Sequence, residues 1–279
     1  MGSVPSPPQP EVLLPEGAPA RPPRRPRPAW AAAPATHLLV GINCGVFLAM
    51  VMRGASIWMP TLDQLMAWGA DRPNNVLVNG EWVRIVTAMF VHVGILHLAT
   101  NMWCLWNLGL LAEPLMGSFG LIAAYILTGA AGNLLSTYRN WMWPMHDATG
   151  AVYFSAGAGA SGAVFGIAGA LIVLLKSKLL PVPPQELRKL RRSVIYFAVI
   201  NLVIGLSVNF GAGFTGVEVD NSAHIGGFLC GLLFAAPMVP RIGSPRGEFQ
   251  MKLRLTVALV VLILVLFGFY IAHIPPPQG

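Results

Sequence analysis

One apolar stretch of the chain, residues 157–176, reads GAGASGAVFGIAGALIVLLK. It carries no charge before Lys176, and its single hydroxyl belongs to Ser161. A run of about 20 apolar residues can cross the hydrocarbon layer of a bilayer as a helix, because a helix pairs its own backbone groups. The stretch therefore predicts a membrane-spanning helix with a lone serine near one end.

The composition of the whole chain also indicates a membrane protein. Of 279 residues, 55% are hydrophobic and 10% are charged, and the mean hydropathy is +0.63. A soluble domain carries about 25% charged residues, so the composition excludes a soluble enzyme and a chain disordered throughout. The net charge of +7 does not indicate a nucleic-acid partner, because the basic residues lie between apolar blocks rather than in one patch.

Seven apolar blocks are predicted to span the membrane, which defines an all-α, polytopic membrane helix bundle. They lie near residues 36–53, 94–113, 119–137, 157–175, 194–210, 223–240 and 254–274. The predicted domains are a disordered Pro/Arg-rich tail at 1–34, a six-helix domain at 35–240, and a linker with one additional C-terminal transmembrane helix at 241–279. The long segment 54–93 is rich in Trp, Met and Leu and is expected to form short helices at the membrane interface.

The distribution of Lys and Arg predicts the orientation in the membrane. Cytoplasmic segments tend to hold the basic residues, and an N-terminus inside the cell puts 14 of the 18 on that side and 4 on the other. The 14 are Arg21, Arg24, Arg25, Arg27, Lys176, Lys178, Arg188, Lys189, Arg191, Arg192, Arg241, Arg246, Lys252 and Arg254, and the 4 are Arg53, Arg72, Arg84 and Arg139. The C-terminus is then expected outside. No organelle targeting signal is recognised, so a bacterial inner membrane is expected.

Polar side chains mark three of the predicted spans near the same end. His97 and Asn101 lie in the second span, Ser161 in the fourth and His224 in the sixth. About 15 residues, or ~22 Å of helix, separate Ser161 from Lys176 at the inner boundary, and similar lengths follow His97 and His224. In a hydrocarbon layer ~30 Å thick, His97, Ser161 and His224 therefore lie ~5–10 Å below the outer face. Each residue alone is also explained by helix packing, but a common depth indicates a site.

These residue types at one depth predict serine hydrolase chemistry. A serine hydroxyl needs a base that accepts its proton, and His224 is the base at the matching depth. His97 and Asn101 lie four residues apart on one helix face and can donate hydrogen bonds to an oxyanion, together with free N–H groups where the serine's helix begins. Gly227 and Gly231 are spaced so that the fourth and sixth helices can approach closely.

Other mechanisms find little support in the sequence. There is no HExxH motif, and the four aspartates (Asp63, Asp71, Asp147 and Asp220) fall in outer loops or at their edges, which argues against an intramembrane aspartyl protease. A zinc site formed by histidines 92, 97, 146 and 224 has no characteristic spacing. A proton-coupled transporter would need several buried acids, and the spans contain one, Glu113. Neither a metal nor another cofactor is expected.

Five motifs in order resemble those of the rhomboid family of intramembrane serine proteases. They are EWVR at 81–84, HLATN at 97–101, EPLMG at 113–117, GASG at 159–162 and AHIGGFLCG at 223–231, and the likeness covers roughly residues 36–240. The resemblance implies a six-helix bundle in which Ser161 is the nucleophile and His224 the general base. His97, Asn101 and the backbone N–H of Ser161 would form the oxyanion hole.

The resemblance also implies roles for residues around the dyad. Arg84 would be structural in the outer loop, and Glu113 would tie together the cytoplasmic end of the bundle. Phe165 stands where family members often have Tyr and is expected to pack on His224 in the substrate pocket. Apart from the resemblance, water must reach the dyad from the outer side, and His92 is expected either to line that path or to form a hydrogen bond at the membrane interface. The seventh span is read as a structural addition.

The implied partners are the lipid bilayer and single-pass membrane proteins, cut in their transmembrane segments. The substrate is expected to enter past the fifth span, under a lid at 211–216. The alternative is a non-catalytic member of the same fold that binds membrane-protein clients, against which the presence of both Ser161 and His224 argues. The sequence leaves the oligomeric state open.

Overall fold

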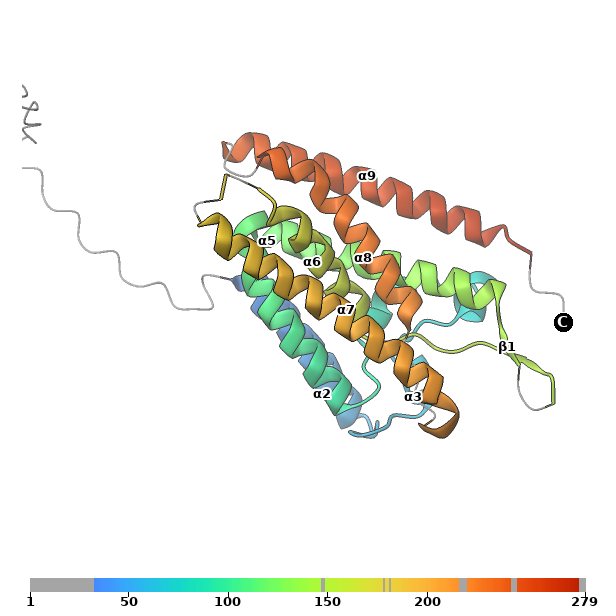
Figure 1. Ribbon diagram of the computed structural model, residues 1–279. Helices are drawn as coiled ribbons and strands as arrows, with labels where there is room; N and C mark the ends of the chain where they lie inside the picture. The colour runs from blue at the N-terminus through green and yellow to red at the C-terminus, as the bar shows by residue number, and fades with distance from the viewer. Residues whose placement is uncertain are drawn as a thin grey trace, which may run out of the picture.

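The chain forms a bundle of helices in a computed structural model that describes residues 33–146, 149–177, 179–180, 182–215, 220–241 and 245–275 (Figure 1). The elements in order are α2 (Pro34–Met52), α3 (Leu62–Ala67), η1 (Asn74–Val78), α4 (Arg84–Thr87), η2 (Ala88–Phe90), α5 (Ile95–Met142), β1 (Met145–His146), β2 (Val152–Tyr153), α6 (Ser161–Leu174), α7 (Pro184–Thr215), α8 (Asn221–Ala235), η3 (Ala236–Arg241) and α9 (Arg246–Ala272). The antiparallel hairpin β1–β2 is the one small sheet in the described part of the chain. The predicted all-α class is confirmed.

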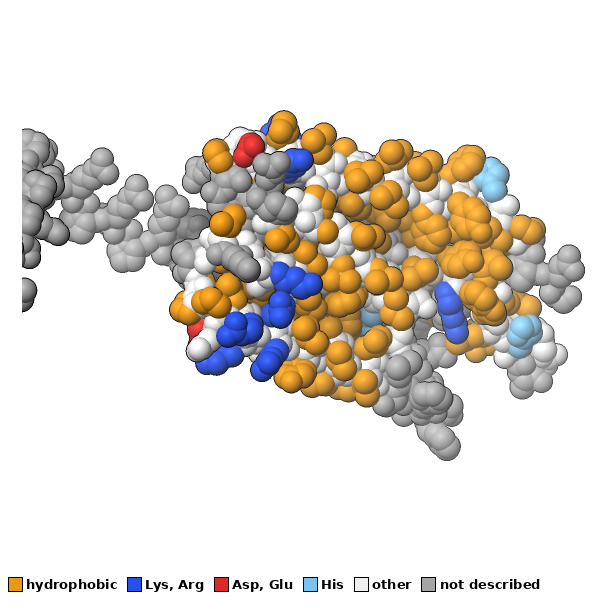
Figure 2. Space-filling view, turned by 45° about the horizontal axis from the view of Figure 1, so that its top comes forward, with side chains coloured by type: hydrophobic (Ala, Val, Ile, Leu, Met, Phe, Trp, Pro, Cys, Tyr) orange, Lys and Arg blue, Asp and Glu red, His pale blue; other side chains and the backbone are white. Residues whose placement is uncertain are grey.

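The helices have the length and surface that a membrane requires. Four helical segments of the described chain are long and apolar enough to cross one: Pro34–Met52, Ile95–Met142, Asn221–Val239 and Gly247–Ala272. In Figure 2, hydrophobic side chains cover most of the middle of the molecule, and Lys and Arg gather toward one end. Such a wide apolar surface is unusual for a soluble monomer but suits contact with lipid. The protein is therefore an integral membrane helix bundle.

The helix α5 contains both the predicted second and third spans. The chain breaks its helical geometry at Gly117, where φ is 77° and ψ is 165°, a conformation that favours glycine. The chain reverses there, since Glu113 contacts the start of α2 whereas Ile95 and Thr137 both contact the loop that follows α2. We call the end of the bundle that holds this loop, residues 54–93, the site end.

At the opposite end of the bundle, Glu113 holds the start of α2. Its carboxylate accepts hydrogen bonds from the backbone N–H groups of Ala35 (2.9 Å) and Thr36 (2.8 Å), and from the hydroxyls of Thr36 (2.7 Å) and Ser118 (2.7 Å). The first N–H groups of a helix have no partner within the helix, and the positive end of its dipole favours an anion. Glu113 thus satisfies these groups and joins α2 to α5.

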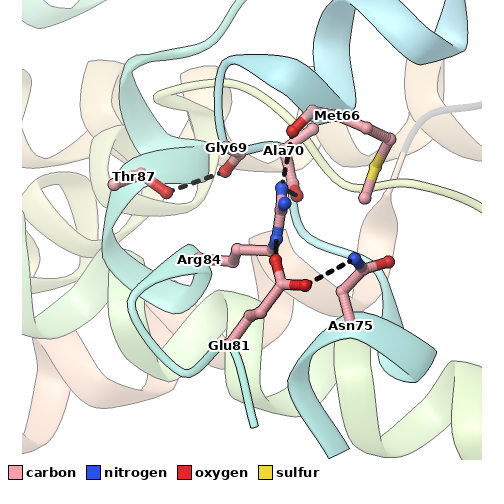
Figure 3. Close-up of polar contacts among 7 residues, drawn as sticks. All are labelled: Met66, Gly69, Ala70, Asn75, Glu81, Arg84 and Thr87. Atoms are coloured by element: carbon pink, nitrogen blue, oxygen red, sulfur yellow. Dashed lines mark hydrogen bonds and ion pairs between the residues drawn. The ribbon is translucent and has the colours of Figure 1, made fainter. Parts of the chain in front are cut away.

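Short helices α3, η1, α4 and η2 occupy the loop 54–93, as its apolar composition predicted. Arg84 joins them, because one of its nitrogens (Nη1) donates to the carbonyls of Met66 (2.8 Å) and Ala70 (3.0 Å) while Nε pairs with Glu81. Asn75 donates to the same Glu81 carboxylate (3.2 Å; Figure 3). The hydrogen bond from Arg84 is the main cause that lowers the pKa of Glu81. The loop is therefore folded around one guanidinium group.

The helix α6 is in contact with both α5 and α8, and glycines set its distance from α8. A methyl group at Gly227 would overlap the carbonyl oxygen of Gly162, and one at Gly231 would overlap that of Gly166. The two backbones therefore touch, which no larger residue at these positions allows. This contact fixes the start of α8 beside the start of α6.

Several helix boundaries differ from the sequence prediction. The block predicted at 157–175 is helical from Ser161, because residue Gly157 instead pairs with Asp71 in an isolated β-bridge. The helices α7 and α9 begin before the predicted residues 194 and 254, since polar helix-forming residues continue both helices beyond their apolar parts. An apolar pattern marks the part of a helix that lies in lipid, and not where the helix ends.

Two predicted segments fall wholly or partly outside the described residues. Most of the proposed N-terminal tail, residues 1–32, lies there. Of the proposed lid, Gly216 also lies there, while the backbone of residues 211–215, expected as a loop, is the last part of α7.

Candidate functional site

A cavity of about 310 Å³ opens at the site end of the bundle, where α6 and α8 begin. Its wall contains five of the residues singled out from the sequence: His97, Asn101, Ser161, Phe165 and His224. These residues come from α5, α6 and α8, so three helices supply polar groups to one space. The helix α7 closes part of the wall with Phe197, Asn201 and Ile204.

The chain reaches Ser161 through a segment that the loop 54–93 holds in place. Gly157 exchanges two backbone hydrogen bonds with Asp71, and the N–H of Gly159 donates to the carbonyl of Ala88 (2.9 Å). Gly159 has a φ of 128°, and a side chain there would come within 2.5 Å of Cε1 of His97. Glycine therefore permits both the turn before Ser161 and the close approach of the His97 ring.

His224 lies in the first turn of α8, with 6% of its surface exposed. Its ring stacks on Phe165 of α6, with centroids 4.2 Å apart and planes at 9°. This contact limits the orientations of the imidazole and points to a fixed base. No hydrogen bond joins Ser161 to His224 within the described part of the chain; such catalytic contacts often tighten only when substrate binds.

His97 and Asn101 occupy one face of the first part of α5. The amide of Asn101 donates to the carbonyl of His97 (2.9 Å), and the two side chains line the cavity. An amide group has two N–H donors, so one remains for another acceptor. The Nδ1 atom of the His97 ring is buried without a partner in the structure. Both residues can thus supply donors to a group bound beside Ser161.

His92 lies behind His97 rather than in the cavity wall. Its surface is 0% exposed, its ring centroid is 5.3 Å from that of His97, and its Nε2 has no hydrogen-bond partner among the described residues. A buried, unpaired ring nitrogen next to the cavity is a place where a water molecule can be held. The structure therefore places the group that we associated with a water path one layer deeper than the other site residues.

Asp220 is a residue of the cavity wall that the sequence reasoning assigned to a loop edge. It is the N-cap of α8, where its carboxylate accepts a hydrogen bond from the N–H of Ala223 (2.9 Å). Asp71, which the sequence also placed in a loop, is buried with 3% exposed surface. An aspartate just before an apolar run is a helix-start signal, and this signal could have identified Asp220.

The fold and the cavity define a class: a polytopic α-helical membrane protein with a cavity at one end of the bundle, to which separate helices contribute serine and histidine. A family model for the Rhomboid domain matches residues 79–241. The chain therefore belongs to the rhomboid family, as its five motifs indicated.

Several curated relatives carry rhomboid names. The chain is 30% identical to Rhomboid protease GluP of Bacillus subtilis over 243 residues. These residues are 87% of this chain and 41% of GluP. It is 30% identical over 209 residues to Rhomboid protease AarA of Providencia stuartii, with 72% of this chain and 70% of AarA covered. RHOMBOID-like protein 5 of Arabidopsis thaliana is 30% identical over 192 residues, with 68% of this chain and 55% of that protein covered. The chain thus spans less than half of GluP but more than two thirds of AarA.

Proposed function

We propose that the protein is an intramembrane serine endopeptidase that uses a dyad of Ser161 and His224. The observation that carries this proposal is the shared cavity: Ser161 at the start of α6 and His224 at the start of α8 line it together. The glycine contacts between α6 and α8 hold these two helix starts together. Relatives that bear the name rhomboid protease support the same activity.

The chemistry follows from the groups that line the cavity. Ser161 Oγ attacks the carbonyl carbon of the scissile peptide while His224 accepts the hydroxyl proton. The carbonyl oxygen becomes an oxyanion, and the amine leaves with the proton from His224. A water molecule then gives a proton to His224 and its hydroxyl to the acyl group, and His224 returns a proton to Ser161 Oγ as the acyl–oxygen bond breaks.

The oxyanion has donors on two sides. The backbone N–H of Ser161 is at the helix start, where N–H groups have no partner within the helix. Asn101 and His97 line the cavity from α5. Donors that are already in place stabilise the developing charge without reorganising during the reaction, and one such donor is worth about 10²–10³ in rate.

The substrate class is a transmembrane segment of a single-pass membrane protein. The cavity lies within a bundle whose exposed surface is largely apolar, and α7 closes one side with Phe197 and Ile204. A segment that enters from the lipid must unwind locally, because a helix keeps its carbonyls in its own hydrogen bonds. His92 is proposed to hold water near the dyad.

The topology and domain division are proposed from the sequence. The basic residues favour a cytoplasmic N-terminus and an external C-terminus in a bacterial inner membrane, which would place the site end outside. The proposed divisions are 1–34, 35–240 and 241–279. The packing of α2 against α5 supports a protease domain that begins before residue 79, where the family match starts. A reporter enzyme fused to either terminus tests the topology.

The experiment uses the full chain in liposomes with a labelled single-span transmembrane peptide. Ser161→Ala and His224→Ala are each expected to lower the cleavage rate by at least ~10³-fold. Ser193→Ala removes an exposed hydroxyl of α7 and is the matched control, with cleavage unchanged. Cleavage by Ser161→Ala at the wild-type rate would refute the proposal. Peptide binding without cleavage by the wild type would support the non-catalytic alternative.

A further inference from the structure

Two acidic side chains lie near each other at the site end and have no part in the proposed dyad. Asp71 accepts a hydrogen bond from the hydroxyl of Thr137 (2.9 Å), and Asp220 accepts one from the hydroxyl of Ser136. Ser136 and Thr137 are neighbours in α5. Adjacent hydroxyls of one helix thus hold two carboxyl groups that come from distant parts of the chain.

Each acid forms backbone hydrogen bonds with the segment that carries one residue of the proposed dyad. Asp71 donates its N–H to the carbonyl of Gly157 (2.8 Å) and accepts from the N–H of Gly157 (2.7 Å), four residues before Ser161. Asp220 caps α8, and its backbone carbonyl accepts the N–H of His224 (3.2 Å), four residues later. The position of Asp71 therefore fixes the segment that leads to Ser161, and the position of Asp220 fixes the first turn of α8, which carries His224.

Both acids also lie close to Gly157. A methyl group built on Gly157 would be 3.8 Å from Oδ2 of Asp220 and 3.8 Å from Cβ of Asp71. The charge of Asp220 acts on Asp71, Arg84 of α4 acts on Asp71, and Arg139 of α5 acts on Asp220. Neither arginine forms an ion pair with these acids in the described part of the chain.

We propose that Asp71 and Asp220 form a carboxyl brace, a pair of positioning residues that holds the Ser161 segment in register with the His224 helix through the hydroxyls of Ser136 and Thr137. The brace rests on the proposed function, because it acts by aligning the dyad. Neither acid touches the reacting atoms in this role.

The brace makes the site sensitive to pH. Burial, with the charge of Asp220 as a further cause, raises the pKa of Asp71 to about 7, and burial also raises the pKa of Asp220. A carboxyl group with a raised pKa contributes its stability at low pH and loses it as pH rises through the folded-state value. As the pH rises through 7, Asp71 loses its proton, and the repulsion between its charge and the charge of Asp220 weakens the alignment of the two segments.

The test measures kcat, KM and the labelling of Ser161 by a serine-reactive fluorophosphonate probe in the full chain. Asp220→Ala removes the cap and is expected to lower kcat about 10–100-fold while KM stays within about twofold, because a displaced base slows chemistry more than binding. Asp220→Asn keeps a good N-cap and is expected to restore most of the rate. Asp63→Asn, at an exposed acid of α3, is the control and leaves kcat and the pH profile unchanged.

Asp71→Asn mimics the neutral acid and tests the pH dependence. The wild-type kcat is expected to fall above pH 7, whereas this variant keeps its rate at pH 8.5. If Asp220→Ala fails to fold, Ser136→Ala instead removes the hydrogen bond that Ser136 donates to Asp220, together with the one it accepts from Asn140, and a several-fold lower kcat is expected. Wild-type kcat in Asp220→Ala or Ser136→Ala, or the same alkaline loss in Asp71→Asn, would overturn the brace. An inactive Ser161→Ala beside those results leaves the proposed function standing, whereas an active one refutes it.

Discussion

Replacing Gly227 with alanine adds one methyl group where α8 touches α6. The new carbon would overlap the carbonyl oxygen of Gly162 and lie 2.8 Å from its carbonyl carbon and 3.2 Å from its Cα. These are backbone atoms, which cannot rotate away as a side chain can. Since carbon atoms pack at about 3.5–4.0 Å, the two helices must separate by roughly 1 Å at this point.

The expected effects differ in size between stability and rate. Overpacking of a core costs about 1–3 kcal/mol, and the better helix propensity of alanine offsets about 1 kcal/mol of it. His224 lies one turn before Gly227 on α8, so the separation also moves the imidazole away from Ser161. A displacement of ~1 Å lowers the rate of an aligned reaction by about 10²-fold. The cleavage rate should therefore fall by more than the loss of unfolding free energy alone would explain.

The assay compares cleavage of the labelled transmembrane peptide, probe labelling of Ser161 and thermal unfolding in the same preparation. The matched control is Gly45→Ala in α2, because nothing lies within 4 Å of the added carbon. This control is expected to cleave at the wild-type rate and to be stabilised by up to about 1 kcal/mol. If Gly227→Ala cleaves within twofold of the wild type, the argument that backbone contact aligns the dyad is wrong.

Two further substitutions test the surroundings of the site. Gly159→Ala places a side chain at a φ of 128° and 2.5 Å from the His97 ring, so labelling of Ser161 should fall at least ~10-fold; unchanged labelling would contradict the described turn. Glu113→Gln removes a charged acceptor of four hydrogen bonds at the far end of the bundle, and should lower the free energy of unfolding by about 1.5–3 kcal/mol in a denaturation measurement while kcat changes little. A large drop in kcat at unchanged stability would speak against this structural role of Glu113.

The fold class could be predicted from the sequence because lipid acts on each span separately. A helix that crosses the membrane must be apolar along its own length, whatever its neighbours are, so the blocks are visible without tertiary information. The same logic failed at helix ends. The backbone of α7 continues to Thr215 through a glycine-containing segment that we expected to be a loop, because hydropathy does not report backbone conformation.

The site residues could be predicted only as far as the depth of a residue in the membrane can be calculated from helix rise per residue. Ser161 and His224 were assigned to one level from the residues between each of them and a charged boundary, and they line one cavity in the structure. His92 was expected on a path for water to the dyad, and the sequence could not show that it lies behind His97. Depth is a single coordinate, and the position around the bundle depends on how the helices pack.

The sequence by itself determined the membrane class, the family and the residues at a common depth, because these follow from composition, from motifs and from helix rise. Only the tertiary structure decided that Asp71 and Asp220 both lie beside Gly157. These residues are far apart in the chain, and Asp71 pairs with the segment leading to Ser161 in a loop whose own fold is held by Arg84. Such a contact depends on the paths of several segments at once, so no local pattern of residues records it.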